Sequence, residues 1–380
     1  MATTAIETLT DAFEENFTNR VQAADGESPA VVLSWPSVPI EIVRATGMRP
    51  VVVRGASAAT PESDAHVEPG IFPSRLRHLM DAALAGRLSN AARLIIPRTS
   101  DPDYKCFLYL REFVRTDIAT ALPSTVLFDL LQSNGPDVPD YNAARTRVLF
   151  EELATISGRR ASLDDLRHEI ERTNVARAAL RRLTAQRRGV PRVTGSEVFP
   201  LLGAFWCLPP EDYATLAAQA AENIQSRPPL VGPRVLLAGA PVDCTGLHAA
   251  VESRGAVVVA EVGPWGNDAA GNDVICQGDP ITALSDKYRA DVIGPRTAAT
   301  EMRKWFACAL EEVDAIVFSL PPEDTTFGWD YPALRSLFER KCIPHTSLHS
   351  DPYQPLSDSD AARLDDVITA AETRMEARHG

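Results

Sequence analysis

The sequence predicts an α/β protein with two flavodoxin- or Rossmann-like lobes, each built on a parallel sheet, and a helical segment between them. Short apolar runs alternate with amphipathic stretches at both ends of the chain, whereas the centre has helical spacing almost throughout. Alternation of this kind is typical of parallel sheets covered by helices. The 380 residues, 45% of them apolar and 23% charged, suit two globular domains rather than a disordered or disulfide-based protein.

The first lobe is expected at residues 28–141, after an N-terminal helix within 1–27. Helical spacing at 40–47 and 75–86 ends in each case at a glycine, the residue most suited to a helix C-cap. Apolar runs predict three strands, at 30–34, 50–55 and 92–97. Strand, helix, strand, helix, strand is the order of a parallel sheet.

A helical region is expected at 142–232. Ser162 followed by Asp164 and Asp165 is typical of a capped helix start, and Gly189 and Pro191 end the helix that follows. Seven arginines and no acid lie between 172 and 192, spread around the helix. We expect a solvated face or a subunit contact there, with a phosphate site as the weaker alternative.

The second lobe is expected at 233–380, beyond a linker rich in Pro and Gly at 226–234. Its strands are predicted at 234–241, 256–263, 314–320 and 343–348. Helices are predicted at 243–254, 280–289, 297–313, 331–341 and 357–377. Two lobes of this type imply a cleft with ligands at the carboxyl ends of the strands.

Charge and composition limit the classes of partner and the location that we expect. The formal net charge of −13 disfavours nucleic acid, because the chain repels phosphate backbones at long range. No apolar stretch is long enough to cross a membrane and the N-terminus has no signal-peptide pattern, so we expect a cytoplasmic protein. The six cysteines are too far apart in sequence for a CxxC motif.

Candidate site residues follow the predicted strand ends, which are cleft positions in an open α/β sheet. Two tryptophans offer apolar surface to an aromatic or acyl group, and two aspartates offer polar contacts. The expected substrate-binding residues are Trp35, Ser100, Asp101, Trp265, Gly266 and Asp324.

Cys244 and Asp101 are the candidate catalytic residues. Cys244 precedes a predicted helix, whose N-terminal dipole lowers a thiol pKa and favours a nucleophile. The alternative is that Cys244 is an ordinary buried cysteine. Asp101 is a candidate acid or base.

The segments VPIEIVRATGMRPVVV, RVLLAGAPVD, GAVVVAEVGPWG, DPITALSDKY, DAIVFSL and IPHTSLHSD occur in this order. Together with the long central helix, which carries Asn174 and Arg177, the sequence resembles the 2-hydroxyacyl-CoA dehydratase / benzoyl-CoA reductase subunit family over roughly residues 28–375. The resemblance implies two flavodoxin-like lobes, an acyl-CoA ligand and a homologous partner subunit. It also implies a [4Fe–4S] cluster held by cysteines from separate strand ends, which allows radical elimination of water or ring reduction.

The sequence departs from this family at the positions of the cluster cysteines. They correspond to Ser100, to Pro264 or its neighbour Trp265, and to Leu320 or the two prolines after it. Serine is a poor iron ligand, and proline and leucine are not ligands. We therefore expect no cofactor in this chain and no metal site, with a [4Fe–4S] cluster in a partner subunit.

Three functions stay open on the sequence. The first is a cluster-free subunit that keeps the acyl-CoA-type cleft and works beside a homologous cluster-bearing subunit or a second copy of itself. The second is a redox-independent enzyme that acts on a thioester or small acid through Cys244 or Asp101. The third is a non-catalytic binding or assembly protein.

Overall fold

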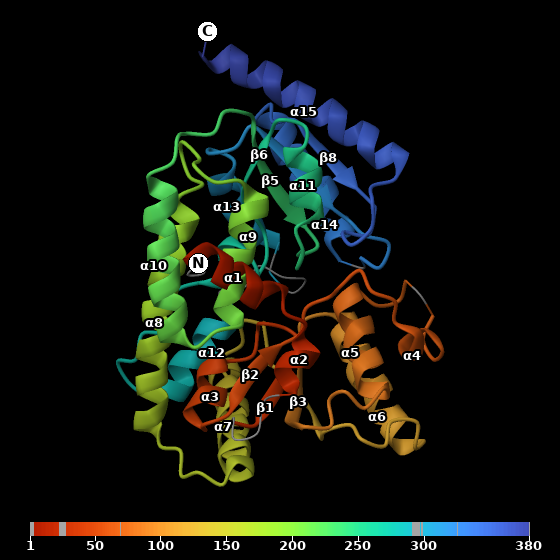
Figure 1. Cartoon of the computed structure of the whole chain (residues 1–380), viewed down its shortest axis with the longest axis vertical. Coiled ribbons are helices and arrows are strands. Elements are labelled where there is room, and N and C mark those ends of the chain that lie inside the picture. Colours follow the sequence, from red (N-terminus) through yellow and green to blue (C-terminus); the bar gives the residue numbers. More distant parts are fainter. Residues whose placement is uncertain are drawn as a thin grey trace.

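The computed structural model describes residues 4–22, 28–68, 70–290, 297, 299–324 and 326–379. Over this part of the chain it contains two four-stranded, entirely parallel sheets, which confirms the predicted α/β class. The two sheets and their helices lie one above the other along the long axis of the molecule (Figure 1). Helices α8 and α10 pack together along one side of both (Figure 1).

The first sheet has the strand order β2-β1-β3-β4. Its strands are β1 (Ala30–Leu33), β2 (Arg49–Val52), β3 (Ala91–Pro97) and β4 (Thr125–Phe128). The accompanying helices are α3 (Ile40–Ala45), α4 (Pro61–Asp64), α5 (Ser74–Leu84), α6 (Asp101–Arg115) and α7 (Val138–Ser157). The sequence analysis did not predict β4, a short edge strand in which only Phe128 is buried and the apolar signal is correspondingly weak.

The second sheet repeats the arrangement of the first, with the order β6-β5-β7-β8. Its strands are β5 (Arg234–Gly239), β6 (Val257–Glu261), β7 (Ala315–Ser319) and β8 (His345–Leu348). The helices of this half are α11 (Gly246–Glu252), α12 (Pro280–Ala290), α13 (Ala299–Ala309), α14 (Phe327–Arg340) and α15 (Asp358–His379). In both sheets the first strand in sequence has neighbours on either side, which creates a switch point suited to ligand binding.

The remaining helices either precede the first sheet in sequence or lie between the two sheets in sequence. They are α1 (Ala5–Glu14), α2 (Phe17–Val21), α8 (Leu163–Ala185), α9 (Gly195–Gly203) and α10 (Pro210–Gln225). The predicted start of the long helix is confirmed, because Ser162 and Asp165 form a reciprocal capping box at α8. Helix α12 follows the second lobe's β6 in sequence but packs against α7 of the first lobe. The predicted domain boundaries stay predictions.

Two buried arginines tie the helical region to both lobes. Arg177 on α8 pairs with Glu41 of α3, and Arg187, just beyond α8, forms a two-pronged ion pair with Glu261 of β6. The arginine side chains of both pairs are fully buried, so the expected solvated face is wrong for these two positions. Buried ion pairs need a fixed geometry. The two pairs therefore fix the position of each lobe relative to the helical region.

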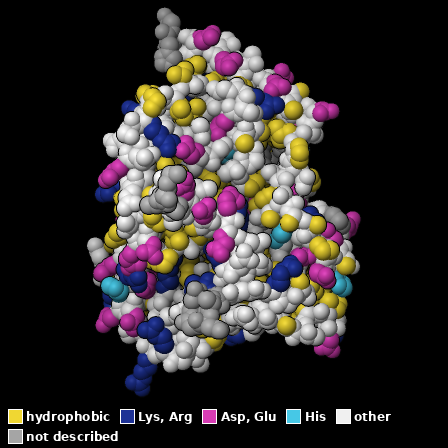
Figure 2. All heavy atoms as spheres, in the orientation of Figure 1, with side chains coloured by type: hydrophobic (Ala, Val, Ile, Leu, Met, Phe, Trp, Pro, Cys, Tyr) yellow, Lys and Arg dark blue, Asp and Glu magenta, His cyan; other side chains and the backbone are white. Residues whose placement is uncertain are grey.

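Helix α8 also has an outward face with ion pairs that are partly or largely exposed. Arg181 contacts Asp273, and Arg172 contacts Glu169 and Glu211. On the face of the molecule shown in Figure 2, Lys and Arg side chains are interspersed with Asp, Glu and hydrophobic side chains. They do not gather into one basic surface on that face.

Candidate functional site

A pocket of about 160 Å³ lies between the two lobes. Residues directly after β1, β3, β5, β7 and β8 line it, so the carboxyl ends of both sheets contribute to one site. The lining includes Trp35, Arg75, Arg98, Ser100, Asp103, Asp243, Tyr288, Pro321, Glu323, Asp324, Phe327, Asp351 and Tyr353.

The first-lobe wall is built around Trp35 and Arg75. The Arg75 guanidinium lies 4.2 Å from the centre of the Trp35 ring, donates to the Ser34 carbonyl at 3.0 Å and to Asp103 Oδ1 at 2.7 Å. A guanidinium over an indole face is a favourable cation–π contact. Trp35 is thereby fixed as an apolar surface of the pocket, in agreement with its expected cleft position.

Ser100 lines the pocket as expected, but its neighbour Asp101 does not. Ser100 is the N-cap of α6 and donates a hydrogen bond to Asp103 Oδ2 at 2.6 Å. Asp101 starts the same helix and is exposed, whereas Asp103, two residues on, is fully buried and faces the pocket. The carboxylate that this loop brings to the cleft is therefore Asp103, not Asp101.

Asp243 joins the two walls. Its Oδ2 accepts a hydrogen bond from the Gly55 backbone N–H of the first lobe at 2.9 Å, and its Oδ1 accepts one from the Tyr353 hydroxyl at 2.8 Å. A Cβ atom at Gly55 would lie 2.7 Å from the Tyr353 hydroxyl oxygen, so only glycine fits there. This contact fixes the separation of the lobes at the pocket.

The second-lobe wall carries a group of carboxylates after β7 and β8. Asp324, an expected site residue, lines the pocket and accepts hydrogen bonds from the backbone N–H groups of Phe327 and Gly328 at the start of α14. Beside it are Glu323 and Asp351. Burial and the negative charges of Asp351 and Asp324 raise the pKa of Glu323 to about 7.

Tyr288 closes the pocket on the side of α12. Its hydroxyl donates to Glu41 Oε2 at 2.8 Å, and Glu41 in turn pairs with Arg177. Burial of Glu41 opposes its ionisation, but the charges of Arg177 and Lys287 hold its pKa below the usual range. The pocket thus rests on a buried polar group that links α3, α8 and α12.

Cys244 is not placed as a reactive nucleophile. Its thiol is buried and donates to the Pro352 carbonyl at 3.4 Å. Burial and the charge of Asp243 raise its pKa to about 12. The expected lowering of this pKa is therefore wrong: α11 begins only at Gly246, and the cost of burying a thiolate dominates. His248, one turn on, contacts Glu261 instead.

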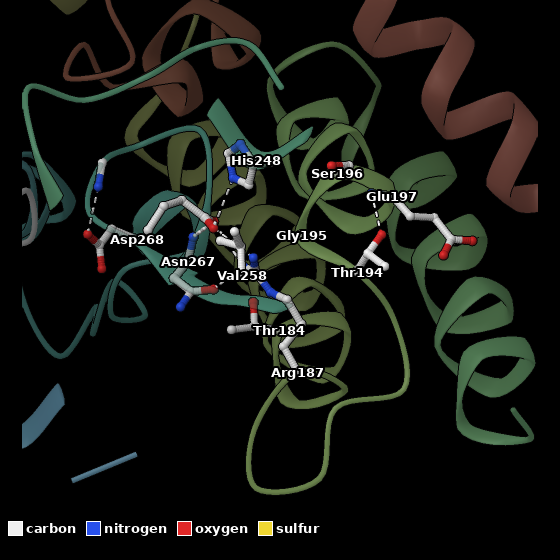
Figure 3. A network of polar contacts seen from close by, with 12 residues as sticks. Thr184, Arg187, Thr194, Gly195, Ser196, Glu197, His248, Val258, Asn267 and Asp268 are labelled. Atoms are coloured by element: carbon white, nitrogen blue, oxygen red, sulfur yellow. Dashed lines mark hydrogen bonds and ion pairs between the residues drawn. The ribbon is translucent and has the colours of Figure 1, made fainter. Parts of the chain in front are cut away.

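Trp265 and Gly266 belong to the interior rather than to the pocket lining. Trp265 is completely buried and its ring packs edge-on against Phe13 of α1 at 5.9 Å. A Cβ at Gly266 would lie 1.8 Å from a carboxylate oxygen of Glu261, within the buried polar network of Arg187, Asn267 and His248 (Figure 3). The expected cleft position of Trp265 is wrong, because the β6 loop turns its ring toward α1 and α9.

The three positions at which the resemblance implies cluster cysteines supply no thiolate. The Ser100 hydroxyl is engaged by Asp103, the Pro264 carbonyl accepts from Trp206 Nε1 at 2.7 Å, and Leu320 is buried. Among the residues that the structure describes, no three or more His, Cys, Asp or Glu side chains are grouped as metal ligands. These residues do not fit an iron–sulfur cluster.

Several polar residues of the pocket were not predicted from the sequence, among them Asp103, Asp243, Glu323 and Tyr353. Glu323 lies next to Asp324 in the same loop, so the position after β7 was a usable signal. Asp243 likewise lies directly before Cys244, the candidate nucleophile. Asp103 and Tyr353 depend on contacts with residues far away in sequence, and no local signal identifies them.

Most of the chain matches a known family model. The family model described as 2-hydroxyglutaryl-CoA dehydratase, D-component, matches residues 37–377. A search of curated proteins found no match. Within the described part of the chain, no helix has the length and apolar character needed to cross a membrane.

Proposed function

The chain belongs to the family of the 2-hydroxyglutaryl-CoA dehydratase D-component, and from this premise we propose that it is a subunit of a dehydratase- or reductase-type complex that binds an acyl-CoA-type substrate in the inter-lobe pocket. The observation that carries the proposal is the pocket itself, which collects the carboxyl ends of both parallel sheets. A cleft at such switch points is the usual ligand site of doubly wound proteins.

The chemistry of the lining supports an acyl ligand. Trp35, Pro321 and Phe327 offer apolar surface, while Arg98 offers hydrogen-bond donors. An apolar pocket with a few polar groups is typical of sites that orient one end of a small molecule.

The cluster, in this proposal, belongs to a homologous partner subunit or is not used at all. Ser100, Pro264 and Leu320 supply no ligand for iron, so this chain shapes the substrate pocket and completes the complex. The rival enzyme based on Cys244 or Asp101 draws no support from a buried thiol of raised pKa and an exposed carboxylate outside the pocket.

The complex is tested by purification of the tagged chain from its native host without oxygen, with iron, acid-labile sulfide and co-purifying subunits measured. We expect a second protein of the same family that carries the iron. Stoichiometric iron in this chain alone would overturn the assignment of the cluster to the partner. The absence of any related subunit, including a second copy, would overturn the proposed complex.

Substrate binding is tested by titration calorimetry of the isolated chain with acetyl-CoA. Loss of an apolar contact the size of an indole costs about 1.5–3 kcal/mol, so Trp35→Ala should weaken binding by roughly ten- to a hundred-fold. Trp329→Ala is the matched control, because Trp329 is 85% exposed on α14 and is not a lining residue. Trp35→Phe covers the case in which the alanine variant does not fold. Equal affinities in all four proteins would refute the assigned pocket.

A further inference from the structure

The loop after β7 brings an unpartnered carboxyl group to the pocket. Glu323 lines the pocket beside Asp324, whose carboxylate is occupied by the backbone of α14, and beside Asp351, which accepts from the Tyr353 backbone N–H at 2.9 Å. The Glu323 carboxyl group forms no hydrogen bond or ion pair with any other described residue. Among the described acids of the pocket, Glu323 is the one whose carboxyl group has no hydrogen bond or ion pair with another described residue.

The charges that face Glu323 come from both lobes. On its own lobe Asp351, Asp324 and Asp243 are negative, and the Tyr353 hydroxyl is donated to Asp243. Arg289 of α12 also lines the pocket, and its guanidinium donates to the Ser133 carbonyl and to Asn134 Oδ1. On the first lobe the nearby cations are Arg77, Arg75 and Arg98.

Each of these arginines already has an acidic partner. They pair with Asp64, Asp103 and Asp129, respectively. The positive charge that reaches Glu323 is therefore weak.

The result is a carboxyl group that changes its protonation near neutral pH. Burial is the largest contribution to a pKa of about 7, and Asp351 and Asp324 add to it. The backbone N–H of Glu323 itself and the charge of Arg77 act in the opposite direction but do not prevail. A pKa close to the working pH is the property that general acids and bases need.

We propose that Glu323 is the proton donor of the inter-lobe pocket, and that its carboxyl group passes a proton to an oxygen atom of the bound acyl group. In this step the O–H bond of Glu323 breaks and its electron pair stays on the carboxylate. A new O–H bond forms on the ligand oxygen as negative charge develops there, and no electron is transferred. Before reaction the same proton makes a hydrogen bond to that oxygen.

The inference rests on the proposed function only for the nature of the ligand. The raised pKa of Glu323 is a property of the chain itself and does not depend on a ligand. The test therefore has one arm without ligand and one arm with it.

The first arm measures carboxyl protonation by difference infrared spectroscopy of the full chain between acidic and alkaline pH. We expect one protonated carboxyl with a midpoint near 7 that disappears in Glu323→Gln. The control is Glu339→Gln, which changes an exposed glutamate on the outer part of α14 and should keep the signal. A midpoint in the ordinary range of carboxyl groups, below about 5, or a signal that survives in Glu323→Gln, would overturn the proposal.

The second arm measures the affinity for acetyl-CoA by calorimetry at pH 6 and pH 8. If only the protonated form binds well, a pKa of about 7 makes the wild-type affinity fall by about ten-fold between these values. Glu323→Gln keeps a donor at all pH values and should lose this dependence, whereas Glu339→Gln should retain it.

Two further outcomes separate the inference from the proposed function. Binding that is independent of pH in the wild type would overturn proton donation to the ligand, even with the infrared signal in place. If no variant binds acetyl-CoA at either pH, the proposed function and the donation to an acyl group both fail. The infrared arm then still decides whether Glu323 is a protonated acid.

Discussion

Removal of the Arg177 charge tests whether the buried contacts of Glu41 with Arg177 and Tyr288 hold the lobes together. In the folded protein the side chains of Arg177 and Glu41 are both 0% exposed, and Tyr288 donates to the second carboxylate oxygen at 2.8 Å. Arg177→Met keeps most of the aliphatic volume but leaves Glu41 without its cation. Breaking a buried pair in this way costs about 3–5 kcal/mol. Because the Tyr288 hydrogen bond remains, we expect a loss near the lower end, about 3 kcal/mol at neutral pH.

The loss should also depend on pH, with a sign that follows from Glu41. In the wild type the folded-state pKa of Glu41 is lowered, so its contribution to stability is present above the unfolded pKa of about 4.3 and is lost below it. In Arg177→Met the larger of the two opposing charges is gone and only that of Lys287 remains, so burial raises the folded-state pKa of Glu41 above the unfolded value. The variant is then destabilised less as the pH falls. The difference in free energy of unfolding between the two proteins should narrow from pH 7 to pH 5.

Urea unfolding followed by both tryptophan fluorescence and far-ultraviolet circular dichroism measures this difference, and coincident transitions justify a two-state treatment. Arg181→Met, one turn along α8, is the matched control. The side chains of Arg181 and its ion-pair partner Asp273 are each about 40% exposed, so this pair should contribute less than about 1 kcal/mol to stability. Glu41→Gln combined with Arg177→Met should cost less than the sum of the two single changes. A loss below about 1 kcal/mol, or one that is the same at both pH values, would refute the reasoning.

Further predictions concern the pocket walls and the core. Cys244 should react with iodoacetamide at alkaline pH far more slowly than the exposed Cys308, because burial raises its pKa to about 12; equal rates would contradict this. Gly55→Ala should lower the free energy of unfolding by about 1–3 kcal/mol, since its Cβ meets a hydroxyl oxygen at 2.7 Å, while Gly278→Ala, with open space around it, should not. Trp206→Phe leaves a buried carbonyl unpaired and should cost about 1–3 kcal/mol in urea unfolding; no change would count against that hydrogen bond.

Much of the fold could be predicted because its signals are local. The alternation of apolar runs with capped helices identifies two parallel sheets, and the Ser162 capping box is visible as a sequence pattern. The ends of strands such as β3 and β7 also follow from the pattern, and the structure places Ser100 and Asp324, which follow these strands, in the lining of the pocket. The half-exposed β4 escaped prediction because an edge strand buries too little apolar surface to stand out.

By itself the sequence determined the α/β class, the long connecting helix and the family, since each depends on residue type and local order. Only the tertiary structure decided which side chains face the pocket. Asp103 rather than Asp101 points inward because Arg75, far away in the chain, supplies its partner. Burial raises the pKa of both Cys244 and Glu323, with opposite consequences: one thiol becomes inert and one carboxyl group becomes a proton donor candidate. The pKa of a side chain depends on its burial and on nearby charges, and these come from residues in many segments of the chain. No single stretch of sequence contains this information.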